Sequence, residues 1–253
     1  MIDQIAIVGY GKMGKMIHSL AESMECNVSS IIDPHQDVQF DAITEESVRG
    51  ADVCLDFSHP SAVLENVRQL AKLGKSMVIG TTGWNEHHSE VRALAEEYKI
   101  GIVFGANFSI GMNLFTRIVE QAAALFDPFA TYDVFGYELH HNQKADSPSG
   151  TAIQLARAII SHSSRKNKAV YEKLDRRIEE DELHFASVRG GRIPGTHTVG
   201  FDSEADTVEL VHRVRNRSCF ALGALQAAKW ISGRKGFYSF NQMMEEILAD
   251  SLH

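Results

Sequence analysis

Residues 138–152 hold the densest group of side chains able to move protons and bind anions. The candidate residues there are His140, His141, Lys144, Gly150 and Thr151. Either histidine could move a proton near neutral pH, where imidazole titrates. The lysine could donate a proton or hold an anion. The glycine and the threonine open a predicted helix, whose first amide groups can bind an anion together with the threonine hydroxyl. The segment therefore indicates acid–base chemistry on an anionic substrate.

Glu138, His140 and His141 also suggest a metal site, because carboxylates and imidazoles are common metal ligands. Adjacent residues of a strand point to opposite faces, however, so the two histidines are poorly arranged to bind one ion together. We therefore expect no metal at this segment.

A second candidate site is the glycine-rich loop at residues 9–14, which reads Gly-Tyr-Gly-Lys-Met-Gly and follows an apolar run. In the G-x-G-x-x-G pattern, Gly9 permits a tight turn, Gly11 lets the backbone approach a pyrophosphate, and Gly14 allows a helix to pack closely on a strand. Asp33 closes the next predicted strand, where a carboxylate meets the adenosine ribose. A simple tight turn with a surface aspartate, or a methyltransferase-like nucleotide fold, would share these features.

The choice of cofactor depends on two charged residues near this loop. Asp33 favours NADH, because a carboxylate repels the 2′-phosphate of NADPH. Lys12 could neutralise that phosphate and allow NADPH as well, or it could simply face solvent. We expect a nicotinamide dinucleotide, NADH and/or NADPH.

The elements that must position these residues alternate along the first hundred residues. Short apolar, β-branched runs predict strands at Ile2–Val8, Val28–Ile32, Val53–Phe57, Met77–Ile79 and Ile102–Phe104. Amphipathic stretches predict helices at Met13–Glu25, Ala62–Leu73 and His87–Tyr98. This alternation predicts a Rossmann-type, doubly wound parallel sheet.

After the first hundred residues, this regular alternation of strands and helices no longer continues. Helices are predicted at Ile110–Phe126, Ser149–Ser161, Phe220–Ile231 and Phe240–Leu248, and a strand at Thr131–His140. Apolar and polar residues alternate over Thr196–Phe201 and Thr207–Val214, which indicates an antiparallel pair. We therefore expect an α/β fold with an inserted α+β domain of mostly antiparallel strands. The expected division is a dinucleotide-binding domain at 1–107, a substrate-binding and oligomerisation domain at 108–216, and a helical return at 217–253.

Composition limits the class of partner. The 253 residues include 25 Lys and Arg against 33 Asp and Glu, a net charge of −8 that disfavours nucleic acid or an anionic membrane surface. The three cysteines, Cys26, Cys54 and Cys219, are scattered, and no apolar run approaches the length of a membrane span. We expect a cytoplasmic protein that acts on a small molecule.

Residues 138–152 closely resemble the E-[LA]-H-H-x-x-K-x-D-x-P-S-G-T-A signature of the 4-hydroxy-tetrahydrodipicolinate reductase family, long called dihydrodipicolinate reductase. Further family-like segments lie along the chain at residues 56–58, 80–83, 106–111, 188–191, 195–199 and 217–221. The resemblance implies NAD(P)H-dependent reduction of 4-hydroxy-tetrahydrodipicolinate, through an unsaturated cyclic imine, to tetrahydrodipicolinate in lysine and diaminopimelate biosynthesis. It also implies a homotetramer built through the sheet of the inserted domain.

The resemblance carries roles to individual residues. It implies that His140 donates and accepts a proton, that Lys144 donates one, and that the substrate carboxylates bind His141, Gly150 and Thr151. The implied cofactor-binding residues are Gly9, Tyr10, Gly11, Lys12, Met13, Asp33, Gly80, Thr81, Thr82, Ala106, Asn107, Phe108 and Ser109.

Two departures from the family pattern concern the cofactor rather than the reaction. The glycine loop is one residue shorter than the longer family version, and His59 stands where some members carry arginine. Two other functions share part of the pattern: another Rossmann dehydrogenase acting on an amino-acid precursor, and a catalytically silent NAD(H)-binding sensor. The first does not account for His-His-x-x-Lys followed by Pro-Ser-Gly-Thr, and intact His140 and Lys144 argue against the second.

Overall fold

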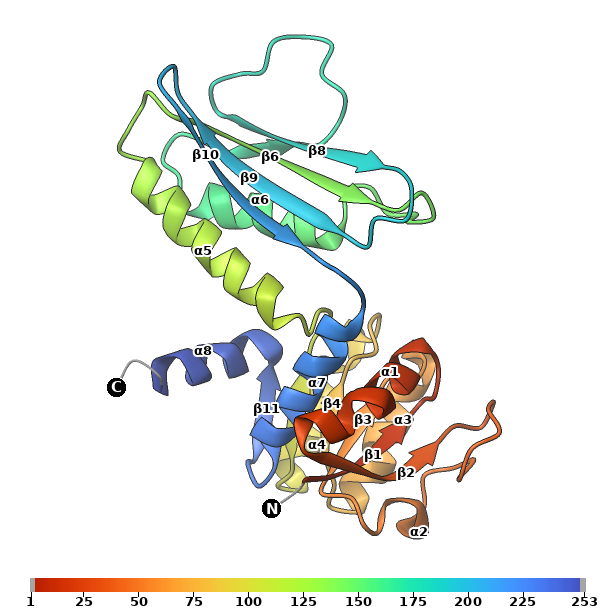
Figure 1. Ribbon diagram of the computed structural model, residues 1–253. Coiled ribbons are helices and arrows are strands. Elements are labelled where there is room, and N and C mark those ends of the chain that lie inside the picture. The colour runs from red at the N-terminus through yellow and green to blue at the C-terminus, as the bar shows by residue number, and fades with distance from the viewer. Residues whose placement is uncertain (1–2, 251–253) are drawn as a thin grey trace. The chain divides into compact units, whose positions relative to one another are not determined.

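The computed structural model describes residues 3–250, which form two compact units (Figure 1). The first unit runs to Ile110 and resumes at Arg217, and the second spans Gly111–Asn216. The predicted start of the first strand at Ile2 lies outside the described residues. In the part of the chain that is described, no helix has both the length and the apolar character needed to cross a membrane.

A six-stranded parallel sheet forms the centre of the first unit. Its strands are β1 (Asp3–Val8), β2 (Cys26–Ile32), β3 (Val53–Asp56), β4 (Ser76–Ile79), β5 (Gly101–Phe104) and β11 (Gly236–Ser239). They pair in the order β11-β5-β4-β3-β1-β2, and every pairing is parallel. The predicted parallel sheet is confirmed. The edge strand β11, which the C-terminal return contributes, was not predicted from the sequence.

Helices cover this sheet on both faces. They are α1 (Lys12–Ala21), α2 (Glu45–Val48), α3 (Pro60–Lys72), α4 (His88–Glu97), α7 (Ser218–Ile231) and α8 (Phe240–Asp250), with 3₁₀ turns η1 (Glu22–Met24) and η2 (Asn85–His87). The chain winds from β1 to β2 in one direction and from β3 to β5 in the other. Because parallel crossovers are right-handed, α1 lies on one face with α7, and α3 and α4 lie on the other. The order reverses between β1 and β3, so a crevice for ligands is expected where these strands end.

The second unit packs two helices against a five-stranded sheet. The helices are α5 (Ile110–Phe126) and α6 (Gly150–Ser161), and the strands are β6 (Asp133–His140), β7 (Lys168–Val170), β8 (Glu182–Arg189), β9 (Thr196–Asp202) and β10 (Thr207–Arg213). The sheet order is β10-β9-β6-β8-β7. The pairing of β10 with β9, predicted from the alternating pattern, is confirmed as antiparallel, and β9 with β6 is antiparallel too. The pairings of β6 with β8 and of β8 with β7 are parallel, which makes the sheet mixed.

Strand β6 brings polar residues onto the buried face of this sheet. Its even-numbered positions are buried from Val134 to His140, because alternate residues of a strand share a face. Val134 belongs to the apolar core with α5 and α6. Glu138 and His140 continue the same face beyond that core, at the carboxyl end of the strand. Both side chains therefore need polar partners from neighbouring elements.

Candidate active site

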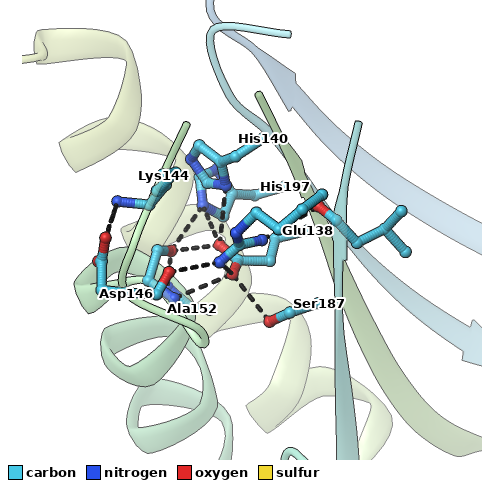
Figure 2. A network of polar contacts seen from close by, with 10 residues as sticks. Glu138, His140, Lys144, Asp146, Ala152, Ser187 and His197 are labelled. Atoms are coloured by element: carbon cyan, nitrogen blue, oxygen red, sulfur yellow. Dashed lines mark hydrogen bonds and ion pairs between the residues drawn. The ribbon is translucent and has the colours of Figure 1, made fainter. Parts of the chain in front are cut away.

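The carboxylate of Glu138 is the centre of a polar network in the second unit (Figure 2). It is completely buried, and its Oε1 accepts hydrogen bonds from the Ser149 amide at 2.9 Å, from Ser187 Oγ at 2.8 Å and from Arg189 Nη2 at 2.9 Å. Its Oε2 accepts one from Ser149 Oγ. Burial alone would raise the pKa of Glu138, but the donors from His197, Ser149 and Arg189 outweigh it and hold the pKa well below its usual range. The side chain is therefore an anion at neutral pH.

Two histidines lie against this anion. His140 Nδ1 is 3.2 Å from Glu138 Oε2, and His197 Nε2 is 3.4 Å from the same oxygen. His197 on β9 stands directly opposite Glu138 in the antiparallel register, and His140 is two residues further along β6 on the same face. The two imidazole rings are 5.2 Å apart and inclined at 72°. Strand register thus assembles one carboxylate with two imidazoles.

His140 is neutral at pH 7 in this environment. Burial is the largest cause that lowers its pKa, to about 4, and the neighbouring cations of Lys144 and Arg189 add to it, while Glu138 opposes them. His140 Nδ1 is enclosed and makes no hydrogen bond among the described residues, but the Glu138 carboxylate 3.2 Å away favours a proton on this nitrogen, which would leave Nε2 as the proton acceptor. Nε2 points toward Gly195, where an added Cβ would come within 3.1 Å of it.

Lys144 lies in the loop between β6 and α6. Its Nζ binds both oxygens of Asp146, at 2.7 and 2.9 Å, and this bond lowers the pKa of the Asp146 carboxyl (Figure 2). Arg189, which holds Glu138, also donates to the Asp146 carbonyl at 2.7 Å. The guanidinium therefore ties the loop that carries Lys144 to the buried carboxylate.

The start of α6 supplies the third part of the site. Ser149 caps the helix, with its Oγ accepting from the Ala152 amide at 3.1 Å. The first intrahelical bond joins the Ile153 amide to the Ser149 carbonyl, so the amides of Gly150 and Thr151 precede it and can donate to a ligand. A Cβ at Gly150 would have open space around it, which leaves this end of the helix accessible.

His141 lies one residue beyond β6 and is half-buried. Its Nδ1 is enclosed and has no hydrogen-bond partner among the described residues. The structure therefore brings together His140, Lys144 and the start of α6 in one unit, with His141 on the chain between them.

A metal ion could also be considered at Glu138, His140 and His197, whose ligand atoms all lie within 4.8 Å of one another. This set of ligands differs from the one that the sequence suggested, because His197 replaces His141. Glu138, however, already accepts four hydrogen bonds, and the Arg189 guanidinium among these donors would repel a cation. These three residues are therefore better suited to proton transfer than to metal binding.

In the first unit, the glycine loop lies where β1 ends. Gly9 has φ = +90°, and a Cβ there would come within 2.6 Å of the Phe57 carbonyl oxygen. A Cβ at Gly14 would lie 2.2 Å from the Gly9 oxygen, whereas one at Gly11 would meet nothing within 4 Å. Close packing thus requires glycine at positions 9 and 14, whereas Gly11 leaves open space at the start of α1. This arrangement fits a pyrophosphate.

Two cavities flank this loop, with volumes of about 430 and 420 Å³. Gly9, Gly11 and Asp33 line the first. The second is lined by Gly11, Lys12, Met13, Phe57, Ser58, Pro60, Gly80, Thr81 and Thr82. The Asp33 carboxylate is held by the amides of Tyr10 at 2.7 Å and His35 at 2.8 Å. Gly11, Phe57 and Ser58 line both cavities, so the two adjoin at the loop where a pyrophosphate is expected.

The remaining expected cofactor residues, Ala106, Asn107, Phe108 and Ser109, form the loop after β5 and are not among the residues lining these two cavities. Asn107 Oδ1 accepts from the Ser109 amide at 2.9 Å, which shapes the loop. The Phe108 ring is buried and packs 4.7 Å from the ring of Phe240. Its side chain therefore belongs to the core of the first unit.

Several residues that organise the two sites were not predicted as site residues from the sequence. In the first unit, the buried Asp56 carboxylate accepts from Ser58 Oγ at 2.6 Å, Thr81 Oγ1 at 3.1 Å and Asn66 Nδ2 at 2.9 Å. In the second unit, they are Ser149, Ser187, Arg189 and His197. Asp56, Ser149, Arg189 and His197 lie in the segments that resemble the family, and this resemblance was the signal that could have identified them.

Comparison with known proteins places the chain in a family. Residues 3–108 match the family model described as dihydrodipicolinate reductase, N-terminus, and residues 111–244 match dihydrodipicolinate reductase, C-terminus. A 4-hydroxy-tetrahydrodipicolinate reductase from Christiangramia forsetii is 32% identical over 246 residues, which are 97% of this chain and 98% of that protein. One from Pseudomonas fluorescens is 38% identical over 206 residues, 79% of this chain and 76% of the relative.

A solved structure agrees with this. The structure described as dipicolinate-bound dihydrodipicolinate reductase from Paenisporosarcina sp. TG-14 is 27% identical, with a TM-score of 0.76, and the match covers 96% of this chain and 99% of that one. The expected fold and resemblance are confirmed. The chain belongs to the dihydrodipicolinate reductase family, a family of pyridine-nucleotide-dependent oxidoreductases with a Rossmann domain.

Proposed function

We propose that this chain reduces 4-hydroxy-tetrahydrodipicolinate, through the unsaturated cyclic imine, to tetrahydrodipicolinate, with NADH or NADPH as the reductant. The observation that carries the proposal is the buried Glu138–His140 pair beside Lys144 and the open start of α6. Family membership supports the substrate, and the similar solved structure is described as bound to dipicolinate, which is a dicarboxylate.

The substrate carboxylates bind at the start of α6. The amides of Gly150 and Thr151 donate to one carboxylate, because they precede the first intrahelical bond. His141, which is half-buried in the adjacent loop, donates to the substrate from there. These contacts fix the ring and so bring it into reactive orientation.

His140 and Lys144 handle the proton that the reduction requires. When bound, the dinucleotide supplies a hydride to the conjugated ring. His140 is neutral in the free protein, since its pKa is lowered to about 4, and the negative charges of the substrate favour its protonated form. Lys144, which Asp146 holds at 2.7 Å, is the second donor close to the same site.

The residues of the first unit fit a nicotinamide dinucleotide. The glycine loop and the start of α1 hold the pyrophosphate, with Asp33 on the ribose at one side. Lys12, the first residue of α1, lines the adjoining cavity rather than the one that holds Asp33. We propose that its charge reaches a 2′-phosphate from there, so that both NADH and NADPH are used. The loop Ala106–Ser109 contacts the dinucleotide through its backbone, because the Phe108 ring is buried.

We also propose a cytoplasmic homotetramer. Three apolar side chains of the second sheet, Val188, Val208 and Val211, are exposed by 37% to 51%, which supports association through that sheet. Light scattering coupled to size-exclusion chromatography tests this proposal, and a monomeric mass would contradict it.

The activity is tested by an assay coupled to the synthase that makes the substrate, with NAD(P)H absorbance as the readout. We expect absorbance to fall with either cofactor only when the upstream enzyme is active. No loss of absorbance with either cofactor would overturn the proposed function.

A further inference from the structure

Glu138 joins two parts of the site through its two carboxylate oxygens. Oε1 accepts a hydrogen bond from the backbone amide of Ser149 at 2.9 Å, and Oε2 accepts one from the hydroxyl of the same residue. Ser149 is the residue that caps α6, immediately before the Gly150 amide. Oε2 also lies 3.2 Å from His140 Nδ1. One buried carboxylate thus contacts both the helix start and the histidine.

The position of this carboxylate is determined from several elements. Ser187 and Arg189 on β8 donate to Oε1 at 2.8 and 2.9 Å, and His197 on β9 lies 3.4 Å from Oε2. The charged or titratable groups that act on His140 are Glu138 from β6, His197 from β9, Arg189 from β8 and Lys144 from the following loop. Glu138 is the anion of this group, so it alone favours a proton on Nδ1 and stabilises the imidazolium.

We propose that Glu138 is a positioning residue that couples the proton-transfer nitrogen of His140 to the anion-binding start of α6. Through Oε2 it holds the proton on Nδ1, and this leaves Nε2 to exchange a proton with the substrate. Through Ser149 it fixes the helix end whose amides bind the substrate carboxylate. Binding of the dicarboxylate and orientation of the proton donor then depend on one side chain. This inference rests on the proposed function for its kinetic readouts.

The proposal has two parts: the contact of Glu138 with His140, which we call the histidine arm, and its contacts with Ser149, which we call the helix arm. Glu138→Gln tests the first separately from the second. The amide oxygen of glutamine must occupy the Oε1 position, because Ser187, Arg189 and the Ser149 amide all donate there. The amide nitrogen then faces His140 and donates to Nδ1, which moves the imidazole proton to Nε2. We expect the ¹⁵N NMR shifts of His140 to report this change of tautomer in the free protein.

The kinetic expectation for Glu138→Gln follows from the same change. Turnover should fall by roughly 10- to 100-fold, a part of what a positioned acid–base group contributes. The high-pH limb of kcat should move to lower pH, because removal of the anion lowers the pKa of His140 further. Dipicolinate affinity should change little, since the bond to the Ser149 amide and the cap on the Ala152 amide are kept, and Ser149 Oγ can accept from the glutamine amide nitrogen in place of donating to Oε2.

Ser149→Ala tests the helix arm. It removes the Oγ bond to Glu138 and the cap on the Ala152 amide, and leaves the carboxylate beside His140. We expect weaker dipicolinate binding by calorimetry and a higher KM, with the tautomer of His140 unchanged. Normal dipicolinate affinity in this variant would overturn the helix arm of the proposal.

The matched control is Glu182→Gln. Glu182 is a second buried carboxylate in the same unit, and it is paired with Lys168 and Arg176 at 2.8 Å rather than with a histidine. Any loss of stability from removing a buried anion appears in this control, which should keep the His140 tautomer and the pH profile. An unchanged tautomer in folded Glu138→Gln would overturn the histidine arm.

The tautomer and dipicolinate binding are measured without turnover, so they also separate this inference from the proposed function. Wild-type protein that binds dipicolinate and carries the proton on Nδ1, but reduces no substrate, would contradict the proposed function alone.

Discussion

Gly195 lies against the Nε2 edge of the His140 ring: a Cβ at this glycine would come within 3.1 Å of His140 Nε2. Gly195 also has φ = +154°, a conformation that side-chain-bearing residues rarely adopt. It precedes β9, the strand that carries His197. Space and backbone conformation therefore both require glycine next to His140 Nε2, the nitrogen that we propose exchanges a proton with the substrate.

Gly195→Ala is expected to lower both stability and turnover. Strained backbone costs about 1–3 kcal/mol, and the added methyl group displaces the His140 ring. Urea unfolding and steady-state kinetics measure the two effects. Gly50→Ala is the control, because its Cβ would meet its nearest neighbour at an ordinary 3.6 Å. Unchanged turnover in Gly195→Ala would show that Nε2 does not need this space.

Substitution of the proton-handling residues should stop the chemistry without preventing cofactor binding. His140→Ala and Lys144→Ala are each expected to lower turnover by about 10²-fold or more. NADH affinity, measured by fluorescence titration, should stay near the wild-type value, because the glycine loop lies in the other unit. Lys168→Ala is the control, since this lysine pairs with Glu182 instead. Wild-type rates in both variants would refute the assigned roles.

Stability should depend on pH through His140. Its folded-state pKa, about 4, lies below the ordinary value of 6.5, so between these values the unfolded chain binds more protons. The free energy of unfolding should therefore fall as pH drops from 6.5 toward 4. His88 and His212 also have lowered pKa values and add to this trend. Urea unfolding of wild type and His140→Asn at several pH values isolates the contribution of His140. Equal slopes of the free energy of unfolding against pH in the two proteins would contradict this prediction.

The cofactor preference should respond to Lys12. Lys12→Ala is expected to raise the KM for NADPH several-fold and to leave the KM for NADH nearly unchanged, because only NADPH carries the 2′-phosphate. Lys15→Ala serves as the control, since this lysine lies over the Tyr10 ring at 5.7 Å instead of lining either cavity. Equal effects on both cofactors would place Lys12 away from the phosphate.

Local sequence patterns predicted most of the fold. The strand–helix alternation of the first unit and the α5 bounds, Ile110–Phe126, agree with the structure, because both depend on the spacing of apolar residues along short segments. Strand β8 (Glu182–Arg189) was not predicted. It mixes polar and apolar residues: Leu183 and Phe185 lie in the apolar core, whereas Ser187 and Arg189 bind Glu138 on β6.

The sequence by itself determined the glycine loop, the His140–Lys144 segment and the helix start at Ser149, since each is a contiguous motif. Only the tertiary structure decided what surrounds Glu138. Its donors Ser187 and Arg189 lie 49 and 51 residues away along the chain, and His197 comes from a third strand. Strand register, which depends on pairing between distant segments, brings these groups to one buried carboxylate.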